Sequence, residues 1–181
     1  MTHHRRRNNG IDPSKINETV ELSPAQRYAA FKQTQAKQRT VAAEFARSMP
    51  FELDEFQMQA NDALEAGDNV LVAAPTGAGK TVAADFAIYL AQTRNVKAFY
   101  TTPIKALSNQ KYHDLVDQYG TDKVGLLTGD TSINSEADIV VMTTEVLRNM
   151  LYEHSVTLEA LRYVILDEVH YLADRFRGPV W

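Results

Sequence analysis

Small residues, one lysine and one hydroxyl side chain follow the apolar run 69–73 in the segment Ala74-Pro75-Thr76-Gly77-Ala78-Gly79-Lys80-Thr81. Glycine at positions 77 and 79 lets a backbone turn tightly and approach a bound group without an intervening Cβ. Backbone N–H groups of such a loop converge on an anion, and a helix that starts there adds its positive dipole end. Lys80 is placed to neutralise the β- and γ-phosphates of a nucleotide, and the Thr81 hydroxyl to bind Mg²⁺. The usual pattern has glycine where this chain has Ala74, so the match is one residue short.

A second acidic segment lies far downstream, where the apolar run 163–166 ends in Asp167-Glu168-Val169-His170. An aspartate at the carboxyl end of a buried strand commonly holds the magnesium that bridges the phosphates. The adjacent glutamate can orient or deprotonate an attacking water. Alone, this short segment is equally compatible with a solvated strand end. Together with Lys80 and Thr81 it predicts a site for nucleoside triphosphate hydrolysis.

Apolar runs alternate with helical patterns through most of the chain, and this order decides the expected fold. Strands are expected at 70–73, 97–101, 124–127, 139–143 and 163–166, and helices at 57–66, 80–92, 104–118 and 145–152. Near-continuous apolar strands separated by helices predict an α/β fold with a mostly parallel sheet covered by helices on both faces. Ligands of such sheets bind at the carboxyl ends of the strands. Both segments described above fall at such ends.

The first 50 residues differ in character from the rest. Residues 1–22 are polar and aperiodic, which predicts a disordered leader, and its arginines 5–7 form a charge run. Ser23-Pro24 has the form of a helix start, and we expect one helix from there to about Arg47, within an N-terminal helical extension of residues 23–50. Residues 51–181 form the expected main lobe.

An aromatic residue and an amide precede the first of these loops. Phe51 could stack on a purine, and Gln57 could pair with the N6/N7 edge of adenine through two hydrogen bonds. Such a pairing would select ATP over GTP.

Three further segments are expected at the same edge of the sheet, namely 101–111, 128–130 and 143–146. Thr102 as a cap with Pro103 as first helical residue would leave N–H groups free for an anion, and Thr143-Thr144-Glu145 repeats this device. Thr-Pro and Thr-Glu also start helices without any ligand, so one such segment carries no function by itself. Three of them beside an ATPase site favour backbone contacts to a nucleic acid strand.

The overall composition excludes several other classes of protein and of binding site. The 181 residues are 44% hydrophobic and 23% charged, with a net charge of −4 and a pI near 5.7, so any nucleic acid contact must be local. The absence of cysteine excludes disulfides and cysteine metal sites. No run is long enough for a membrane span and the first residues are no secretory signal, so a cytoplasmic protein is expected.

With these residues in view, 51–181 resemble the first motor lobe of a superfamily-two DExH-box helicase. The resemblance is strongest to the Ski-like (superkiller and exosome-associated) branch and its bacterial relatives. The motifs are collinear: Phe51–Gln57 as the adenine motif, Ala74–Thr81 as motif one, 101–111 as motif Ia, 128–130 and 143–150 as Ib and Ic, and Asp167–His170 as motif two. The tail 171–178 is the most specific part of the match, and alanine at position 74 is ordinary in this family.

The resemblance implies a RecA-like P-loop NTPase lobe that uses ATP and Mg²⁺ for 3′-to-5′ translocation, typically on RNA. It assigns phosphate and metal binding to Lys80 and Thr81, metal binding to Asp167, the hydrolytic water to Glu168, and a link between the ATP and nucleic acid sides to His170. It places contacts to the strand at Thr102, Pro103, Lys105, Thr128, Gly129, Thr144 and Glu145.

The chain stops at Trp181, before the family's motif three and second motor lobe. We therefore expect a fragment of a longer enzyme that alone binds Mg-ATP weakly and hydrolyses it little, since the completing arginine is worth about 10³–10⁵ in turnover. The expected partners are single-stranded RNA or DNA, the second lobe and an RNA-processing complex. Two alternatives stay open: a duplex translocase without unwinding, and a non-catalytic nucleotide- or RNA-binding module.

Overall fold

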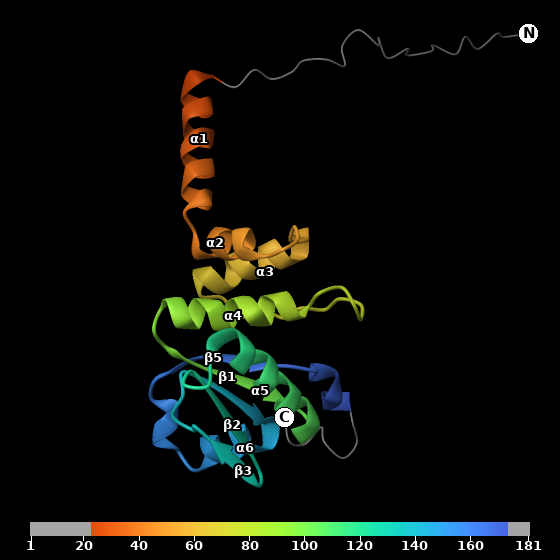
Figure 1. Cartoon of the computed structure of the whole chain (residues 1–181). Coiled ribbons are helices and arrows are strands. Elements are labelled where there is room, and N and C mark those ends of the chain that lie inside the picture. Colours follow the sequence, from red (N-terminus) through yellow and green to blue (C-terminus); the bar gives the residue numbers. More distant parts are fainter. Residues whose placement is uncertain (1–22, 174–181) are drawn as a thin grey trace, which may run out of the picture. The chain divides into compact units, whose positions relative to one another are not determined.

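The computed structural model describes residues 23–173, and the chain divides into two units between Arg39 and Thr40 (Figure 1). Helix α1 (Pro24–Gln38) is the described part of the first unit. Ser23 caps it as expected, because its hydroxyl accepts the N–H of Gln26 at 3.3 Å while the Gln26 side chain accepts the N–H of Ser23 at 2.8 Å. The predicted leader 1–22 lies outside the described residues.

The prediction of one helix from 23 to 47 is wrong, because a second helix, α2 (Val41–Ser48), begins after a break at residues 39 and 40. The hydroxyl of Thr40 accepts the N–H of Ala43 at 3.1 Å, and the carboxylate of Glu65 accepts those of Val41 and Ala42 at 3.0 and 2.7 Å. These acceptors satisfy three N–H groups that a helix start leaves without partners. Helix α2 therefore belongs to the second unit.

A five-stranded sheet with the order β3-β2-β4-β1-β5 forms the centre of the second unit. Its strands are β1 (Lys97–Thr102), β2 (Val124–Thr128), β3 (Thr131–Ile133), β4 (Ile139–Thr143) and β5 (Leu161–Leu166). All neighbours pair in parallel except β3, which was not expected and forms a hairpin with β2 across Gly129 and Asp130. The expected α/β fold with a mostly parallel sheet is confirmed.

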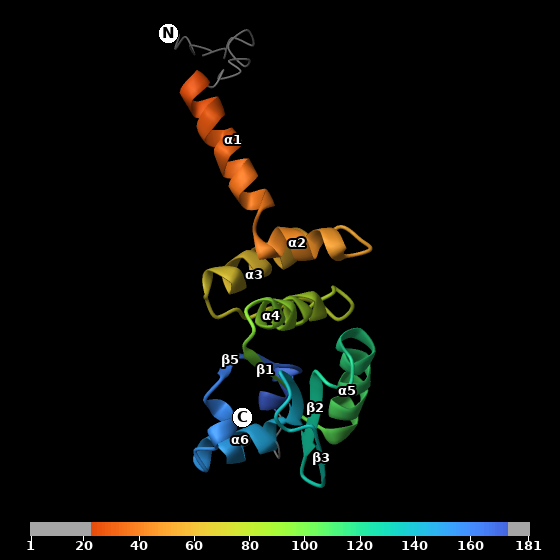
Figure 2. The ribbon, with the colours of Figure 1, turned by 60° about the vertical axis from the view of Figure 1, so that its left-hand side comes forward.

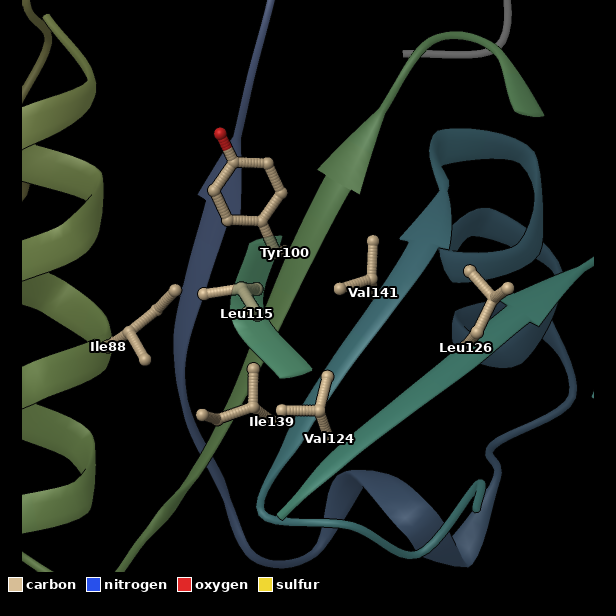
Figure 3. Packing of buried hydrophobic residues seen from close by; sticks show 7 residues of the cluster. All are labelled: Ile88, Tyr100, Leu115, Val124, Leu126, Ile139 and Val141. Atoms are coloured by element: carbon tan, nitrogen blue, oxygen red, sulfur yellow. The ribbon is translucent and has the colours of Figure 1, made fainter. Parts of the chain in front are cut away.

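Helices cover the sheet on both faces, as Figures 1 and 2 show. Helices α4 (Thr81–Thr93) and α5 (Lys105–Tyr119) pack on one face, where Ile88 and Leu115 meet Tyr100 and Val141 (Figure 3). Helix α6 (Thr144–Tyr152) packs on the opposite face through Leu147. Helices α2 and α3 (Glu55–Ala66) lie on the outer side of α4. The short helices η2 (Val156–Leu158) and η3 (Val169–Ala173) flank β5.

The predicted strand at 70–73 is wrong, since these residues form no strand and the side chain of Leu71 is 80% exposed. A strand exists only through pairing, and among the described strands β5 is an edge of the sheet that pairs only with β1. On β5 the side chains of Val164 and Leu166 are 45% and 47% exposed. Both the apolar segment and this edge therefore keep unburied apolar surface.

No helix among residues 23–173 is long and apolar enough to cross a membrane.

Candidate nucleotide and metal site

The loop before α4 has the backbone of an anion cradle. Gly77 and Gly79 adopt positive φ angles of 84° and 75°, the left-handed region in which glycine is favoured. Within the described chain, the N–H groups of Gly77, Gly79, Lys80 and Thr81 have no protein acceptor, whereas that of Ala78 donates to the carbonyl of Pro75 at 3.2 Å. Successive free N–H groups at a left-handed turn and a helix start form a concavity for anions. The sequence prediction for residues 75–81 thus has a matching backbone.

The ammonium group of Lys80 folds back onto its own loop. Its Nζ donates to the carbonyl oxygens of Ala74 and Pro75 at 2.8 and 2.9 Å. The side chain is exposed and forms no ion pair with an acidic residue among residues 23–173, so its charge is available to an incoming phosphate. Exchanging two neutral carbonyl acceptors for an ionised phosphate strengthens these hydrogen bonds.

Gln57 braces this loop from helix α3. Its Oε1 accepts the N–H of Asp54 at 2.8 Å, and its Nε2 donates to the carbonyl of Gly79 at 3.0 Å. The side chain is 4% exposed, so both ends of the amide already have protein partners. Reading adenine would use the remaining hydrogen and lone pair, and this role stays a prediction. Phe51 is 51% exposed, which leaves its ring free to stack.

At the end of β5 the carboxylate of Asp167 is held on both oxygens. Oδ2 accepts the hydroxyl of Tyr100 at 2.7 Å, and Oδ1 accepts the N–H of Glu168 at 2.8 Å. Glu168 has a φ of 55°, a left-handed conformation that is uncommon for a non-glycine residue. Its Oε2 lies 2.9 Å from Nδ1 of His170. Two hydrogen bonds therefore orient the carboxylate of Asp167, whereas Glu168 and His170 contact each other at the surface.

Tyr100 is 1% exposed, and it acts as a donor at any physiological pH. Burial first, and then the negative charge of Asp167, raise the pKa of its hydroxyl far above the usual value. A protonated phenol donates one hydrogen and leaves the second lone pair of the carboxylate oxygen available.

The donor set suits magnesium. Mg²⁺ prefers oxygen ligands and is commonly held by one or two carboxylates together with substrate phosphates and water. Asp167 offers a pre-oriented carboxylate and Thr81 an exposed hydroxyl at the start of α4. No hydrogen bond or ion pair among the described residues joins 75–81 directly to 167–170. Binding of Mg²⁺ by Thr81 and Asp167 remains a prediction.

The hydroxyl groups expected on the nucleic acid rim point into the protein. Thr102 is 1% exposed and its Oγ1 contacts the Oγ of Ser108 at 2.7 Å, while Thr144, 6% exposed, donates to the carbonyl of Thr102 at 3.3 Å. Helix α5 starts at Lys105 with Ile104 in the capping position, so the expected cap at Thr102 with Pro103 as first helical residue is wrong. The structure brings Thr102 and Thr144 together, but as an internal brace between β1 and α6.

A second group on this rim is exposed and charged. Lys105 forms an ion pair with Asp130, with Nζ at 2.7 and 2.6 Å from the two carboxylate oxygens. Thr128, 8% exposed, donates to the same carboxylate at 3.1 Å. These hydrogen bonds, that of Lys105 first, lower the pKa of Asp130. Gly129 and Glu145 are exposed and Pro103 is half-buried, so surface contacts to a strand would come from Lys105, the backbone and these positions.

Comparison with known proteins decides the family. The family model described as "DEAD/DEAH box helicase" matches residues 54–181. The chain belongs to the DEAD/DEAH box helicase family. It is 63% identical over 137 residues to "Probable helicase HelY" of Mycobacterium tuberculosis, which covers 76% of this chain and 15% of that protein. It is 52% identical over 136 residues to "Antiviral helicase SKI2" of Saccharomyces cerevisiae, covering 75% of this chain and 11% of the relative.

A solved structure supports the same helicase fold. The Mycobacterium smegmatis helicase Lhr, bound to ssDNA and AMP-PNP, aligns with a TM-score of 0.60 and 30% identity over 77% of this chain and 21% of that chain. The resemblance to Ski-like DExH helicases is thus confirmed. The chain spans only a small part of the length of each of these helicases.

Sequence analysis missed the residues behind the acidic segment of this helicase lobe. Tyr100 lies inside an apolar strand run, and Lys111 and Asp85 lie on helices, so only spatial contacts reveal them. Nζ of Lys111 forms an ion pair with Asp85 at 3.0 Å and lies 4.9 Å from the centre of the Tyr100 ring.

Proposed function

We propose that this chain is the ATP-binding lobe of an ATP-dependent DExH-box helicase that couples hydrolysis to translocation on, and unwinding of, nucleic acid. The observation that carries this proposal is the loop at 77–81 of a chain from a helicase family: four of its N–H groups have no acceptor within the described residues, and its lysine bonds only neutral carbonyls there. Family membership favours this reading over a non-catalytic binding module. Residues 51–181 are the proposed lobe.

On the nucleotide side, each residue has one task. The N–H groups of residue 77 and residues 79–81 bind phosphate oxygens, and Lys80 moves from the carbonyls of its loop to the β- and γ-phosphates. Thr81 and Asp167 would hold Mg²⁺, which when bound neutralises charge on the phosphates. Glu168 accepts a proton from the attacking water, since its carboxylate lies directly after the metal-binding aspartate.

On the nucleic acid side, the proposed contacts are to the strand backbone. Lys105 supplies the cation, and backbone groups at Gly129 and near Glu145 line the same carboxyl edge of the sheet. Backbone contacts position a strand without reading its sequence. RNA is the strand that the Ski-like resemblance favours, whereas the Lhr structure contains ssDNA.

Nucleotide binding is tested by calorimetric titration of the chain with a non-hydrolysable ATP analogue in MgCl₂. Lys80→Ala should reduce affinity at least tenfold, because it removes the counter-charge of the phosphates. Lys123→Ala is the matched control, since Lys123 pairs with Asp138 at the amino ends of β2 and β4. Equal affinity of wild type and Lys80→Ala would refute the assignment of the loop.

The polymer is tested by fluorescence anisotropy with a single-stranded RNA, a DNA of the same sequence and the matching duplex. Tighter binding of RNA than of DNA would support an RNA helicase. Binding of the duplex alone would support the duplex translocase instead.

A further inference from the structure

The candidate metal ligand Asp167 is attached to a network of buried polar groups that no step of the proposed reaction uses. Tyr100 donates to Asp167, Lys111 lies over the Tyr100 ring, and Asp85 holds Lys111. The side chains of Lys111 and Asp85 are only 14% and 29% exposed, so both charges lie largely within the protein. A largely buried ion pair is costly to assemble, so its position beside Tyr100, the residue that holds Asp167, suggests a role for the pair.

The sheet register explains why Tyr100 meets Asp167. Tyr100 pairs with Ile165 in the parallel register of β1 and β5. Residues two apart in an extended chain lie on the same face, so Ile165 and Asp167 both share a face with Tyr100. The N–H of Asp167 donates to the carbonyl of Thr101 at 3.0 Å, which continues the ladder by one residue. The phenol therefore reaches the carboxylate from a fixed strand position.

The other end of the network lies on the helix that begins at the phosphate loop. Asp85 lies one turn after Thr81 on α4, and Lys111 lies on α5. Attraction between the ammonium group and the face of the Tyr100 ring adds to the ion pair with Asp85. Helix α4 and the end of β5 are thereby connected by four side chains, although no hydrogen bond or ion pair within residues 23–173 joins the loop 75–81 to 167–170.

We propose that Tyr100 is a positioning residue that orients the carboxylate of Asp167 for its metal, and that Lys111 and Asp85 hold Tyr100 in place relative to the phosphate loop. This inference rests on the proposed function and adds to it the residues that hold the proposed metal ligand in place. Removing outer partners of metal-binding carboxylates commonly costs 10–100-fold in metal affinity. Tyr100 acts through Asp167 and touches no nucleotide.

The test measures how strongly metal promotes nucleotide binding. A non-hydrolysable ATP analogue is titrated into the chain once in MgCl₂ and once in EDTA, and Mn²⁺ binding with that analogue is followed by electron paramagnetic resonance. Tyr100→Phe should leave affinity in EDTA unchanged and weaken Mn²⁺ binding at least tenfold. Tyr119→Phe is the matched control, because Tyr119 packs against the same cluster at the distant end of α5.

A Tyr100→Phe chain with the metal response of wild type would overturn the inference alone, and so would an equal loss in Tyr119→Phe. If the wild-type chain binds the ATP analogue equally well in MgCl₂ and in EDTA, both the inference and the proposed metal site are wrong. If Tyr100→Phe does not fold, Lys111→Met decides, since methionine keeps the contact with the ring and removes the charge. A reduced metal response in Lys111→Met supports the network, and an unchanged one overturns it.

Discussion

Replacing Asp130 by asparagine should strengthen binding of a nucleic acid strand, because Asp130 neutralises the cation that faces the proposed strand. Both carboxylate oxygens of Asp130 hold Lys105, at 2.7 and 2.6 Å. Asparagine keeps an oxygen that can accept the hydroxyl of Thr128 but removes the negative charge. The side chain of Lys105 is 46% exposed, so the released ammonium group can reach a phosphate.

The magnitude follows from counterion release. Each lysine that neutralises a phosphate of a single strand contributes about 0.7 to the slope of log affinity against log salt concentration. Asp130→Asn should therefore steepen the slope by about 0.7, which corresponds to roughly a 2.5-fold larger loss of affinity between 50 and 200 mM salt. The assay is fluorescence anisotropy with a labelled single-stranded RNA at four or more salt concentrations.

The structure offers a matched control for this change in net charge. Asp138 pairs with Lys123 in the same way, but these residues precede β4 and β2 and lie at the amino edge of the sheet. Asp138→Asn changes net charge by the same amount and should leave the slope as in wild type. An equally steeper slope of log affinity against log salt concentration in both variants would mean that only the net charge of the chain affects this slope. An unchanged slope in Asp130→Asn would show that Lys105 does not face the strand.

Four further outcomes are expected. Gly125→Ala should lower the free energy of unfolding by roughly 1–3 kcal/mol in urea denaturation, because an added Cβ would lie 2.1 Å from the carbonyl oxygen of Asn134. Gly129→Ala, with open space around it, should change that free energy by less than about 0.5 kcal/mol. Glu168→Gln should preserve nucleotide affinity but reduce phosphate release at least about 100-fold, since it removes the base and keeps the size. The pKa of Asp130 is lowered from 3.8, so its ion pair stabilises the fold above that pH. The stability difference between wild type and Asp130→Asn should then shrink as acidity takes the pH through the lowered pKa, measured by urea denaturation at pH 6, 4 and 3.

Most of the sheet was predictable because four of its five strands contain an apolar run. β1, β2 and β4 are almost wholly buried, and such runs stand out from the amphipathic helices between them. β3 was not predicted because it is three residues long and mostly exposed. Only its hairpin with β2 makes it a strand. The segment 70–73 shows the reverse case, since its composition favours a strand but none of the strands that the structure describes pairs with it.

The backbone of the proposed phosphate loop was predictable for a local reason. Gly77, Gly79, Lys80 and Thr81 act within one turn of chain, so their spacing in the sequence is also their spacing in space. The side-chain orientation of the rim threonines was harder to predict, because it depends on which face of a strand or helix each residue occupies. Thr102 and Thr144 end up facing each other through a contact between β1 and α6, 42 positions apart. Their hydroxyl groups bond inside the protein, and the contacts to a strand that were predicted for these two residues stay a prediction.

The contact of Tyr100 with Asp167 shows where sequence reasoning ends. The two residues are 67 positions apart, and each has a sufficient local explanation, one as a strand tyrosine and the other as an acidic residue of motif two. Only the parallel register, with Tyr100 opposite Ile165, places phenol and carboxylate together. A register shifted by one residue would turn the phenol to the opposite face of the sheet and leave Oδ2 without this donor. The orientation of the proposed metal ligand is therefore a property of the strand pairing, and substitutions that alter the pairing of β1 with β5 should weaken metal binding even when every motif is intact.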